Sequence, residues 1–149
     1  MRWVTRRHIR VNRLATAWLI RRFIDPDAVF LFVEPSEVAA IQEREGALGF
    51  DAPGATYPHA DARGRCSFEA LVDEHCGKDE VLRTLALIVR GADFPNESSL
   101  TPESAGVRAI SQGFPLVSAN DAATLERGQF LYDALYASLR ERLRSGPRR

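Results

Sequence analysis

The most informative hydrophobic pattern in the chain lies in residues 11–25, VNRLATAWLIRRFID. On a helix its apolar residues, among them Leu14, Trp18 and Ile20, spread nearly all the way round, whereas the apolar residues of a surface helix keep to one stripe. Pro26 restricts the residue before it and cannot continue the helix ladder, so the helix is expected to end at Asp25. The pattern predicts a helix at the centre of the fold.

Two short β-prone runs flank this helix. Residues 3–5 form the first, and residues 29–33, which are continuously apolar and bounded by prolines, form the second. Because the helix would be the crossover between them, a parallel β-α-β unit is the economical topology. Residues 48–50 and 55–57 are expected to add brief edge strands.

Capping residues and helical periodicity predict the remaining elements. Ser36 is expected to cap a short helix that Gly46 ends, and Gly91 is expected to end a strongly periodic helix that starts at Asp79. The expected helices beyond the first cover 36–45, 67–76, 79–90, 102–112 and 121–143, with a break at 113–115 and a long loop at 46–65. The pattern predicts one α+β domain over residues 1–149, mainly helical, with five to six helices and a small sheet.

Composition narrows the class of protein. The chain has 149 residues, 45% hydrophobic and 27% charged, which is ordinary for a globular domain. Twenty basic and twenty acidic residues leave no net charge to attract nucleic acid or an anionic membrane, although arginines crowd both ends, including Arg148 and Arg149. Two cysteines, no signal-peptide pattern and no long apolar run predict a cytoplasmic protein without a membrane partner.

The long loop carries the first group of candidate functional residues. His59, Asp61, Cys66 and Glu69 lie within eleven residues, and imidazole with carboxylates suits zinc or ferrous iron. Their spacing matches no zinc-ribbon or zincin pattern. The alternative is a surface histidine and an acidic residue that complements a helix N-terminus.

Cys66 is a candidate redox residue. It directly precedes the helix expected from Ser67, whose positive pole, together with Arg65, would lower the pKa of the thiol and favour the thiolate. The alternative is a small buried cysteine, which is the usual role of a free cysteine.

Arginines form the second group of candidates. A guanidinium in a buried helix must meet a carboxylate, a carbonyl or an oxyanion, so Arg13 is expected either to pair with a structural carboxylate or to bind an anion. Arg21 and Arg22 either reach solvent or join the same anion site. In the Arg90-Gly-Ala-Asp93 run, Gly91 would permit a left-handed turn that aims Asp93 across the helix end, either as the rim of a site or as an Arg–Asp pair.

Several blocks of the chain resemble the chromate resistance protein family, specifically its ChrB-type C-terminal domain. The blocks are Trp3-Val-Thr-Arg6, Asn12-Arg-Leu-Ala with Trp18-Leu-Ile-Arg-Arg-Phe-Ile-Asp25, His59, Cys66-Ser-Phe-Glu69, Ile88-Val-Arg-Gly-Ala-Asp93 and Tyr132-Asp-Ala-Leu-Tyr136. Together they cover almost the whole chain.

The resemblance implies a role in bacterial chromate resistance, a stress response in which ChrB-like proteins are linked to chromate-responsive control of an efflux operon. Similar domains also occur fused to rhodanese-type sulfurtransferases. Longer relatives carry an extra N-terminal region associated with regulation, so DNA binding is not expected of this chain. Family members often have Asp at the position of Asn12 and Cys-Pro at Thr16-Ala17, and losing that carboxylate removes a possible partner of Arg13 and a possible site ligand.

These features lead to one hypothesis: helix 11–25, loop 46–69 and turn 90–93 converge on a single polar pocket. The pocket would bind an oxyanion such as chromate or sulfate, or a divalent metal (zinc or iron), in a sensing or detoxifying role. The predicted anion-binding residues are Arg13, Arg21, Arg22 and Arg90, and the predicted metal ligands are His59, Glu69 and Asp93. The alternatives are a metal-dependent or thiol-redox enzyme, and a structural or regulatory domain that forms a homodimer. The sequence leaves open whether the protein is an enzyme.

Overall fold

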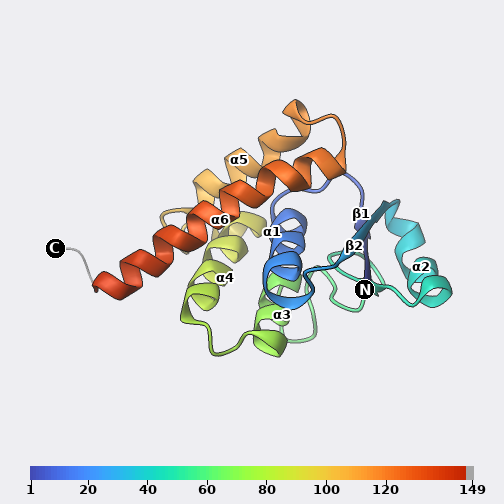
Figure 1. Cartoon of the computed structure of the whole chain (residues 1–149), viewed down its shortest axis with the longest axis horizontal. Helices are drawn as coiled ribbons and strands as arrows, with labels where there is room; N and C mark the ends of the chain where they lie inside the picture. Colours follow the sequence, from blue (N-terminus) through green and yellow to red (C-terminus); the bar gives the residue numbers. More distant parts are fainter. Residues whose placement is uncertain (147–149) are drawn as a thin grey trace.

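A small parallel sheet lies against one end of a group of helices in the computed structural model, which describes residues 1–146 (Figure 1). Strand β1 (Arg2–Arg6), helix α1 (Asn12–Leu19) and strand β2 (Val29–Val33) form the predicted β-α-β unit, with β1 and β2 parallel. A third strand, β3 (Leu48–Gly49), pairs with the other side of β1, which gives the order β2-β1-β3. The predicted α+β class with a small sheet and mainly helical content is confirmed.

The helix predicted at 11–25 is central, as expected. Leu14, Trp18 and Ile20 are buried, and a π-helical turn, Ile20–Ile24, continues α1 before the chain becomes extended at Asp25. The Asp25 carboxylate accepts hydrogen bonds from the N-terminal amino group at 2.8 Å and from Trp3 Nε1 at 3.0 Å. The end of the helix is thereby tied to the start of β1.

The helix after β2 begins differently from the prediction. A 3₁₀ turn, Pro35–Glu37, precedes α2 (Val38–Glu45), and Glu34 rather than Ser36 provides the cap. Pro35 fixes the φ angle at the first helical position. The side chains of Glu34 and Glu37 each accept a hydrogen bond from the other's backbone N–H group. Gly46 ends α2 at φ 64°, as predicted. The strand expected at 55–57 is reduced to a single bridge between Phe50 and Tyr57.

The prediction that Gly91 ends the fourth helix is wrong. Helix α3 (Ser67–His75) is followed by α4 (Glu80–Asp93), which continues through Gly91 and is followed by a 3₁₀ turn, Pro95–Glu97. A side chain at residue 91 would overlap Ser104 of the next helix. The glycine therefore serves close packing between two helices instead of a left-handed turn, and Asp93 occupies the last turn of α4.

The predicted break at 113–115 is also wrong. Helix α5 (Ser104–Val117) starts two residues after Pro102 and contains Pro115 in its last turns. Proline lacks the N–H that would continue the ladder, so the helix ends within three residues of Pro115, in a stretch where Leu116 and Val117 are exposed. Helix α6 (Asp121–Ser145) then runs back beside α5, α4 and α1 (Figure 1).

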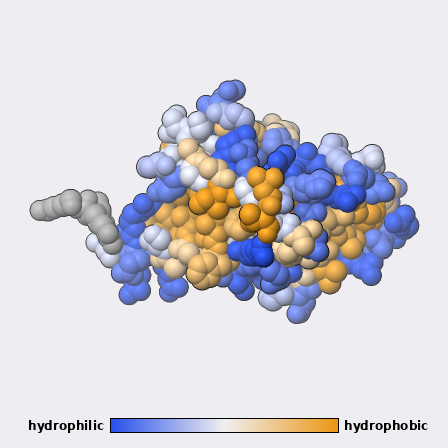
Figure 2. Space-filling view, turned by 90° about the horizontal axis from the view of Figure 1, so that it is seen from above, coloured by the Kyte–Doolittle hydropathy of each residue, from blue (hydrophilic) through white to orange (hydrophobic). Residues whose placement is uncertain are grey.

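The described residues leave several large apolar side chains exposed, among them Leu116, Val117 and Phe130. Figure 2 shows apolar surface over the helical half of the molecule and a second area toward the sheet. Homodimer formation stays a prediction.

Within residues 1–146 no helix combines the length and apolar character needed to cross a bilayer. Arg148 and Arg149, part of the basic C-terminal end, lie outside the described residues.

Candidate functional site

The centre of the candidate site is Asp51, which the sequence analysis did not single out. Its side chain is only 3% exposed, and its own backbone N–H donates to Tyr57 O at 2.7 Å. The preceding residue is also held, because Phe50 N donates to Val4 O of β1. Asp51 has φ 49°, an uncommon value for a residue other than glycine. The two residues that follow β3 therefore hold this carboxylate in a fixed place beside the end of β1.

Three basic side chains from three segments meet at Asp51. His59 Nδ1 lies 2.8 Å from Oδ1, Arg6 Nη2 lies 3.3 Å from Oδ1, and Arg13 Nη1 lies 3.5 Å from Oδ2. Arg6 Nε also donates to the Asp51 carbonyl at 2.6 Å. The hydrogen bond to Asp51 raises the pKa of His59 because it stabilises the imidazolium. Arg13 thus pairs with a structural carboxylate, one of the two roles expected for it.

Asp93 approaches the same group from the last turn of α4. Its Oδ2 lies 3.5 Å from His59 Nδ1, and its side chain is 12% exposed. Burial, and after it the charge of Asp51, raise the pKa of Asp93 to about 6. Among the described residues, Asp93 Oδ2 has no hydrogen-bond partner. Arg108, on α5, donates instead to the carbonyl of Ala92 at 2.8 Å.

A cavity of about 260 Å³ opens beside these residues. We call it the arginine pocket; its lining residues are Arg6, Arg10, Val11, Arg13, Asp51, Asp93, Arg108 and Gln112. Four guanidinium groups face two carboxylates, so the lining has an excess of positive charge. Burial lowers the pKa of Arg13, and its Nε is buried with no partner in the described part of the chain. The pocket therefore offers unused donors to an anion.

Arg21 and Arg22 lie elsewhere, where the end of α1 meets α6. Arg21 Nη1 lies 3.1 Å from Glu126 Oε1, and Arg22 binds both oxygens of Asp133 at 3.0 and 2.8 Å. Trp18 Nε1 also donates to Asp133, at 2.8 Å. Neither arginine lines the arginine pocket.

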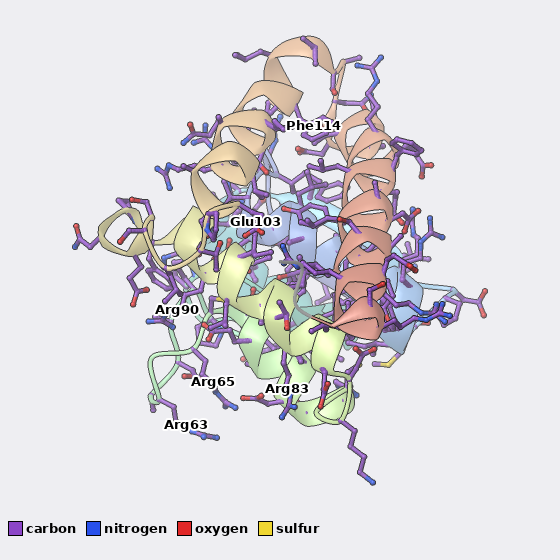
Figure 3. The ribbon with its side chains drawn as sticks, turned by 90° about the vertical axis from the view of Figure 1, so that its left-hand side faces the viewer. Arg63, Arg65, Arg83, Arg90, Glu103 and Phe114 are labelled. Atoms are coloured by element: carbon purple, nitrogen blue, oxygen red, sulfur yellow. The ribbon has the colours of Figure 1, made fainter. Side chains whose placement is uncertain are left out.

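Glu69 and Arg90 pair with each other rather than with the His59 group. Arg90 Nη1 lies 2.8 Å from Glu69 Oε1 and also donates to the carbonyl of Gly64, while its Nε lies 2.8 Å from Glu97. Glu69 sits in the first turn of α3 and accepts a hydrogen bond from Cys66 N at 3.1 Å, which is the helix-end role considered above. Figure 3 shows Arg90 on the same side of the molecule as Arg63 and Arg65.

The predicted metal ligands are thus only partly brought together. His59 and Asp93 are neighbours, and Asp51 joins them in place of Glu69. Across residues 1–146, no three His, Cys, Asp or Glu side chains are grouped closely enough to be recognised as a metal site. Metal binding stays a prediction.

The expectation of a lowered pKa for Cys66 is wrong. The thiol is fully buried in the core, and burial raises its pKa. Arg65 does not act on it as supposed, because its Nε lies 2.8 Å from Asp61 and its Nη1 lies 2.9 Å from Asp73. The structure fits the buried, unreactive alternative.

Asn12 and Thr16, which depart from the family pattern, are buried in a neutral hydrogen-bond network. Asn12 Nδ2 donates to Ser67 Oγ at 2.8 Å, and Thr16 Oγ1 lies 3.1 Å from both Asn12 Oδ1 and Ser67 Oγ. The network joins α1 to the N-terminus of α3. Asn12 therefore has a structural role, and Arg13 finds its carboxylate in Asp51.

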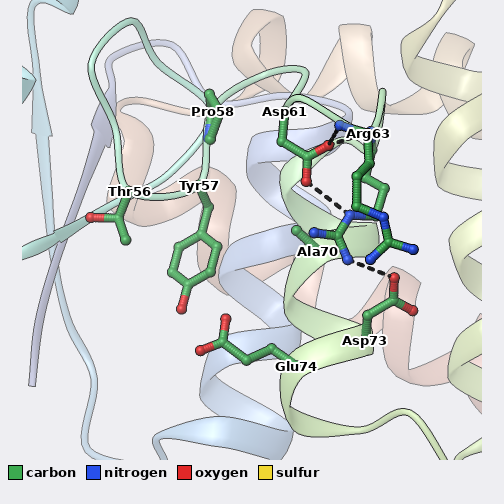
Figure 4. A pocket seen from close by; sticks show the side chains of 9 residues that line it. Thr56, Tyr57, Pro58, Asp61, Arg63, Ala70, Asp73 and Glu74 are labelled. Carbon is green, nitrogen blue, oxygen red and sulfur yellow. Dashed lines mark hydrogen bonds and ion pairs between the residues drawn. The ribbon is translucent and has the colours of Figure 1, made fainter.

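A second cavity, of about 390 Å³, lies under the long loop (Figure 4). Tyr57 and Glu74 point toward one another across it, and burial, followed by the nearby carboxylate of Glu74, raises the pKa of Tyr57 to about 12. Acidic residues outnumber arginines in its lining, and two of them already bind Arg65. This cavity has no excess of positive charge.

Sequence reasoning missed Asp51, Arg6 and Arg108 as members of the site. A signal existed for the first two, since Arg6 ends β1 and Asp51 follows the apolar run at 48–50. The carboxyl ends of parallel strands meet at one edge of a sheet, which is where ligands bind in open parallel sheets. Arg108 sits on a helical face with no such marker.

Comparisons with known proteins agree with the resemblance seen in the sequence. The family model described as "ChrB, C-terminal domain" matches residues 3–139. "Protein ChrB" of Cupriavidus metallidurans is 39% identical over 137 residues, which cover 90% of this chain but 39% of that relative. No solved structure matches the chain.

Proposed function

This chain belongs to the family of ChrB C-terminal domains, and we propose that it binds a tetrahedral oxyanion such as chromate in the arginine pocket. The observation that carries the proposal is the charge of the lining, in which four arginines face two carboxylates. The proposed role is sensing or detoxification in chromate resistance. The chain corresponds to only 39% of the ChrB relative, so this role is proposed for the domain alone.

The weakly satisfied guanidinium of Arg13 supports an anion as the ligand, although its Nη2 donates to the carbonyl of His8 at 3.1 Å. Its guanidinium is 11% exposed, its contact with Asp51 is long at 3.5 Å, and its Nε has no partner among the described residues. Leaving a buried donor unsatisfied costs about 1–3 kcal/mol, and an oxyanion that accepts from it would recover that free energy. Guanidinium groups also match the oxygens of tetrahedral anions in a two-point contact.

Among the predicted anion-binding residues, the proposal retains Arg13 alone. Arg22 and Arg90 already bind carboxylates at 2.8 Å, and Arg21 lies 3.1 Å from Glu126. An anion would have to displace those carboxylates, whereas in the arginine pocket it would meet unpaired positive charge.

A divalent metal is the second candidate ligand. The observation that favours it is the position of His59 Nδ1, which is 2.8 Å from Asp51 Oδ1 and 3.5 Å from Asp93 Oδ2. Imidazole and carboxylate ligands suit zinc or iron. Arg6 and Arg13 beside Asp51 oppose a second cation there, so we rank the anion first.

Isothermal titration calorimetry with chromate tests the proposal. The wild type is expected to bind chromate with a dissociation constant below millimolar, and Arg13→Gln is expected to weaken binding by about 10- to 100-fold, the value of one charge-assisted hydrogen bond to an ion. The matched control is Arg22→Gln, the same change near the end of the same helical segment at an arginine already bound to Asp133. It is expected to leave the affinity within about twofold.

Two outcomes would contradict the proposal. One is the absence of chromate binding by the folded wild type at millimolar concentration, and the other is an equal loss of affinity in the two arginine variants. A zinc titration run in parallel separates the second candidate: heat with zinc that disappears in His59→Ala, with none for chromate, would replace the anion by a metal.

A further inference from the structure

We propose that the arginine pocket prefers oxyanions that carry a proton, such as hydrogen phosphate or hydrogen chromate, over sulfate, and that Asp93 is the residue that recognises the proton. The inference rests on the proposed function, because it names the class of anion that the same pocket accepts. The inference follows from the carboxylate of Asp93, which lines a pocket whose other charged groups favour an anion.

Asp93 is the exceptional member of the lining. Its Oδ2 is buried and has no hydrogen-bond donor within residues 1–146, and the basic atom that approaches it, His59 Nδ1, is 3.5 Å away. Arg108 is close enough to reach the main chain of Ala92 and Asp93, at 2.8 and 3.5 Å, yet it bonds their carbonyls and not the carboxylate. A hydrogen-bond acceptor is therefore left without a donor beside a set of guanidinium donors.

An unsatisfied buried acceptor discriminates between anions by their protons. Sulfate presents four acceptor oxygens and no O–H group at neutral pH, so the oxygen that faces Asp93 would meet another acceptor of like charge. Hydrogen phosphate has the same shape and the same double negative charge, but its O–H can donate to the carboxylate of Asp93, which lines the pocket. A hydrogen bond from a hydroxyl to a carboxylate is among the stronger kinds, and a site that relies on such a bond rejects the analogue that lacks it.

The charged groups around Asp93 are consistent with this role. Asp51 faces it as a second carboxylate, while His59, Arg13 and Arg108 face it as cations or potential cations. Asp51 is occupied by Arg6, Arg13 and His59, so it is not the free acceptor.

Calorimetric titration of the purified chain with inorganic phosphate and with sulfate at pH 7.5 tests the inference. The wild type is expected to bind phosphate at least about tenfold more tightly than sulfate, the effect of one buried hydrogen bond gained or lost. Asp93→Asn supplies an amide donor in place of the acceptor, so it is expected to bind sulfate more tightly than the wild type does and to reduce the ratio to about twofold or less. Asp133→Asn, the same change at the interface of α1 and α6, is expected to keep the wild-type ratio.

The results separate the inference from the proposed function. Equal affinity of the wild type for phosphate and sulfate would overturn the preference and leave anion binding standing, whereas no binding of either anion or of chromate would overturn the proposed function itself. A tenfold preference that survives in folded Asp93→Asn would remove Asp93 from its assigned role. Circular dichroism of each variant shows that it is folded before the titration.

Discussion

Arginines meet carboxylates at two places in this molecule, and the two places are matched differently. At the interface of α1 with α6, Arg22 binds Asp133 and Arg21 binds Glu126, one cation to one anion. In the arginine pocket, Asp51 is shared by two arginines and a histidine, and the Oδ2 atom of Asp93 has no hydrogen-bond donor among the described residues. Balanced pairs connect two helical segments, whereas the unbalanced set is the one that we propose binds an anion.

The burial of each charged group determines how much it contributes to stability. Arg22 and Asp133 are 45% and 42% exposed, so water screens them, and the interface depends more on the packed rings of Trp18, Phe23 and Tyr136. Asp51 and Arg13 are 3% and 11% exposed, so water screens the interaction between their charges less than it screens the interaction between Arg22 and Asp133. Changes in the pocket should therefore alter stability far more than the same changes at the interface.

The largest effect is expected from Asp51→Asn. Removing this charge leaves the nearly buried guanidinium of Arg13 without its carboxylate, which should lower the free energy of unfolding by about 2–4 kcal/mol, as measured by urea denaturation. Millimolar phosphate should restore more stability to the variant than it adds to the wild type, because the pocket has gained positive charge and a bound anion stabilises the folded state. A variant as stable as the wild type would show that Asp51 is not the centre of the site.

Asp93→Asn should act in the opposite direction. The pKa of Asp93 is about 6 in the folded protein and has its ordinary value, near 4, in the unfolded chain, so the folded state binds the proton more tightly. Stability is thus greatest while Asp93 is protonated and falls as the pH rises from about 4 to 6. At pH 8 the variant should be more stable than the wild type by about 1–2 kcal/mol, with the gain disappearing near pH 4.

Denaturation of both proteins between pH 4 and pH 8 checks this prediction. A variant that is less stable than the wild type at pH 8 would contradict it. A gain in stability would sharpen the contrast between the two regions, because groups that serve binding often cost stability, whereas groups that serve packing do not.

The smallest effect is expected from Asp133→Asn. The hydrogen bonds from Arg22 lower the pKa of Asp133, so its contribution is present at neutral pH and is lost as the pH falls through the folded-state value. Because both partners are exposed by more than a third, the loss should be at most about 1 kcal/mol at pH 7. Thermal melts at pH 7 with and without added phosphate check it: an effect comparable to that of Asp51→Asn, or a specific rescue by phosphate, would erase the distinction between the regions.

Local pattern was sufficient for most of the fold. The β-α-β unit, the central helix and the end of α2 at Gly46 depend on periodicity, proline and glycine, which act over a few residues. Gly91 and Pro115 were misread because their local preferences were outweighed by context: Gly91 allows α4 to approach Ser104 of α5, and Pro115 lies in an exposed final stretch of α5.

The candidate site was only half predictable. The sequence indicated that Arg13, His59 and Asp93 converge, and they do, but it also grouped Arg90 and Glu69 with them, although these two bind each other. Residue type shows what a side chain can bind and does not show which partner lies next to it in the folded protein. Arg90 pairs with Glu69, 21 positions away, and with Glu97.

The sequence by itself determined the α+β class, the buried helix at 11–25 and the family, because each is written in short runs of residues. Only the tertiary structure decided that Asp51 anchors the site, that Arg6 and Arg108 line it, and that Asp93 keeps a free acceptor. Arg13 and Asp51 are 38 positions apart and Asp51 and Asp93 are 42 apart in the chain, and their meeting depends on how strands and helices pack. The net charge of a pocket is the sum of the charges of all residues that line it, and these residues come from segments that are far apart in the sequence.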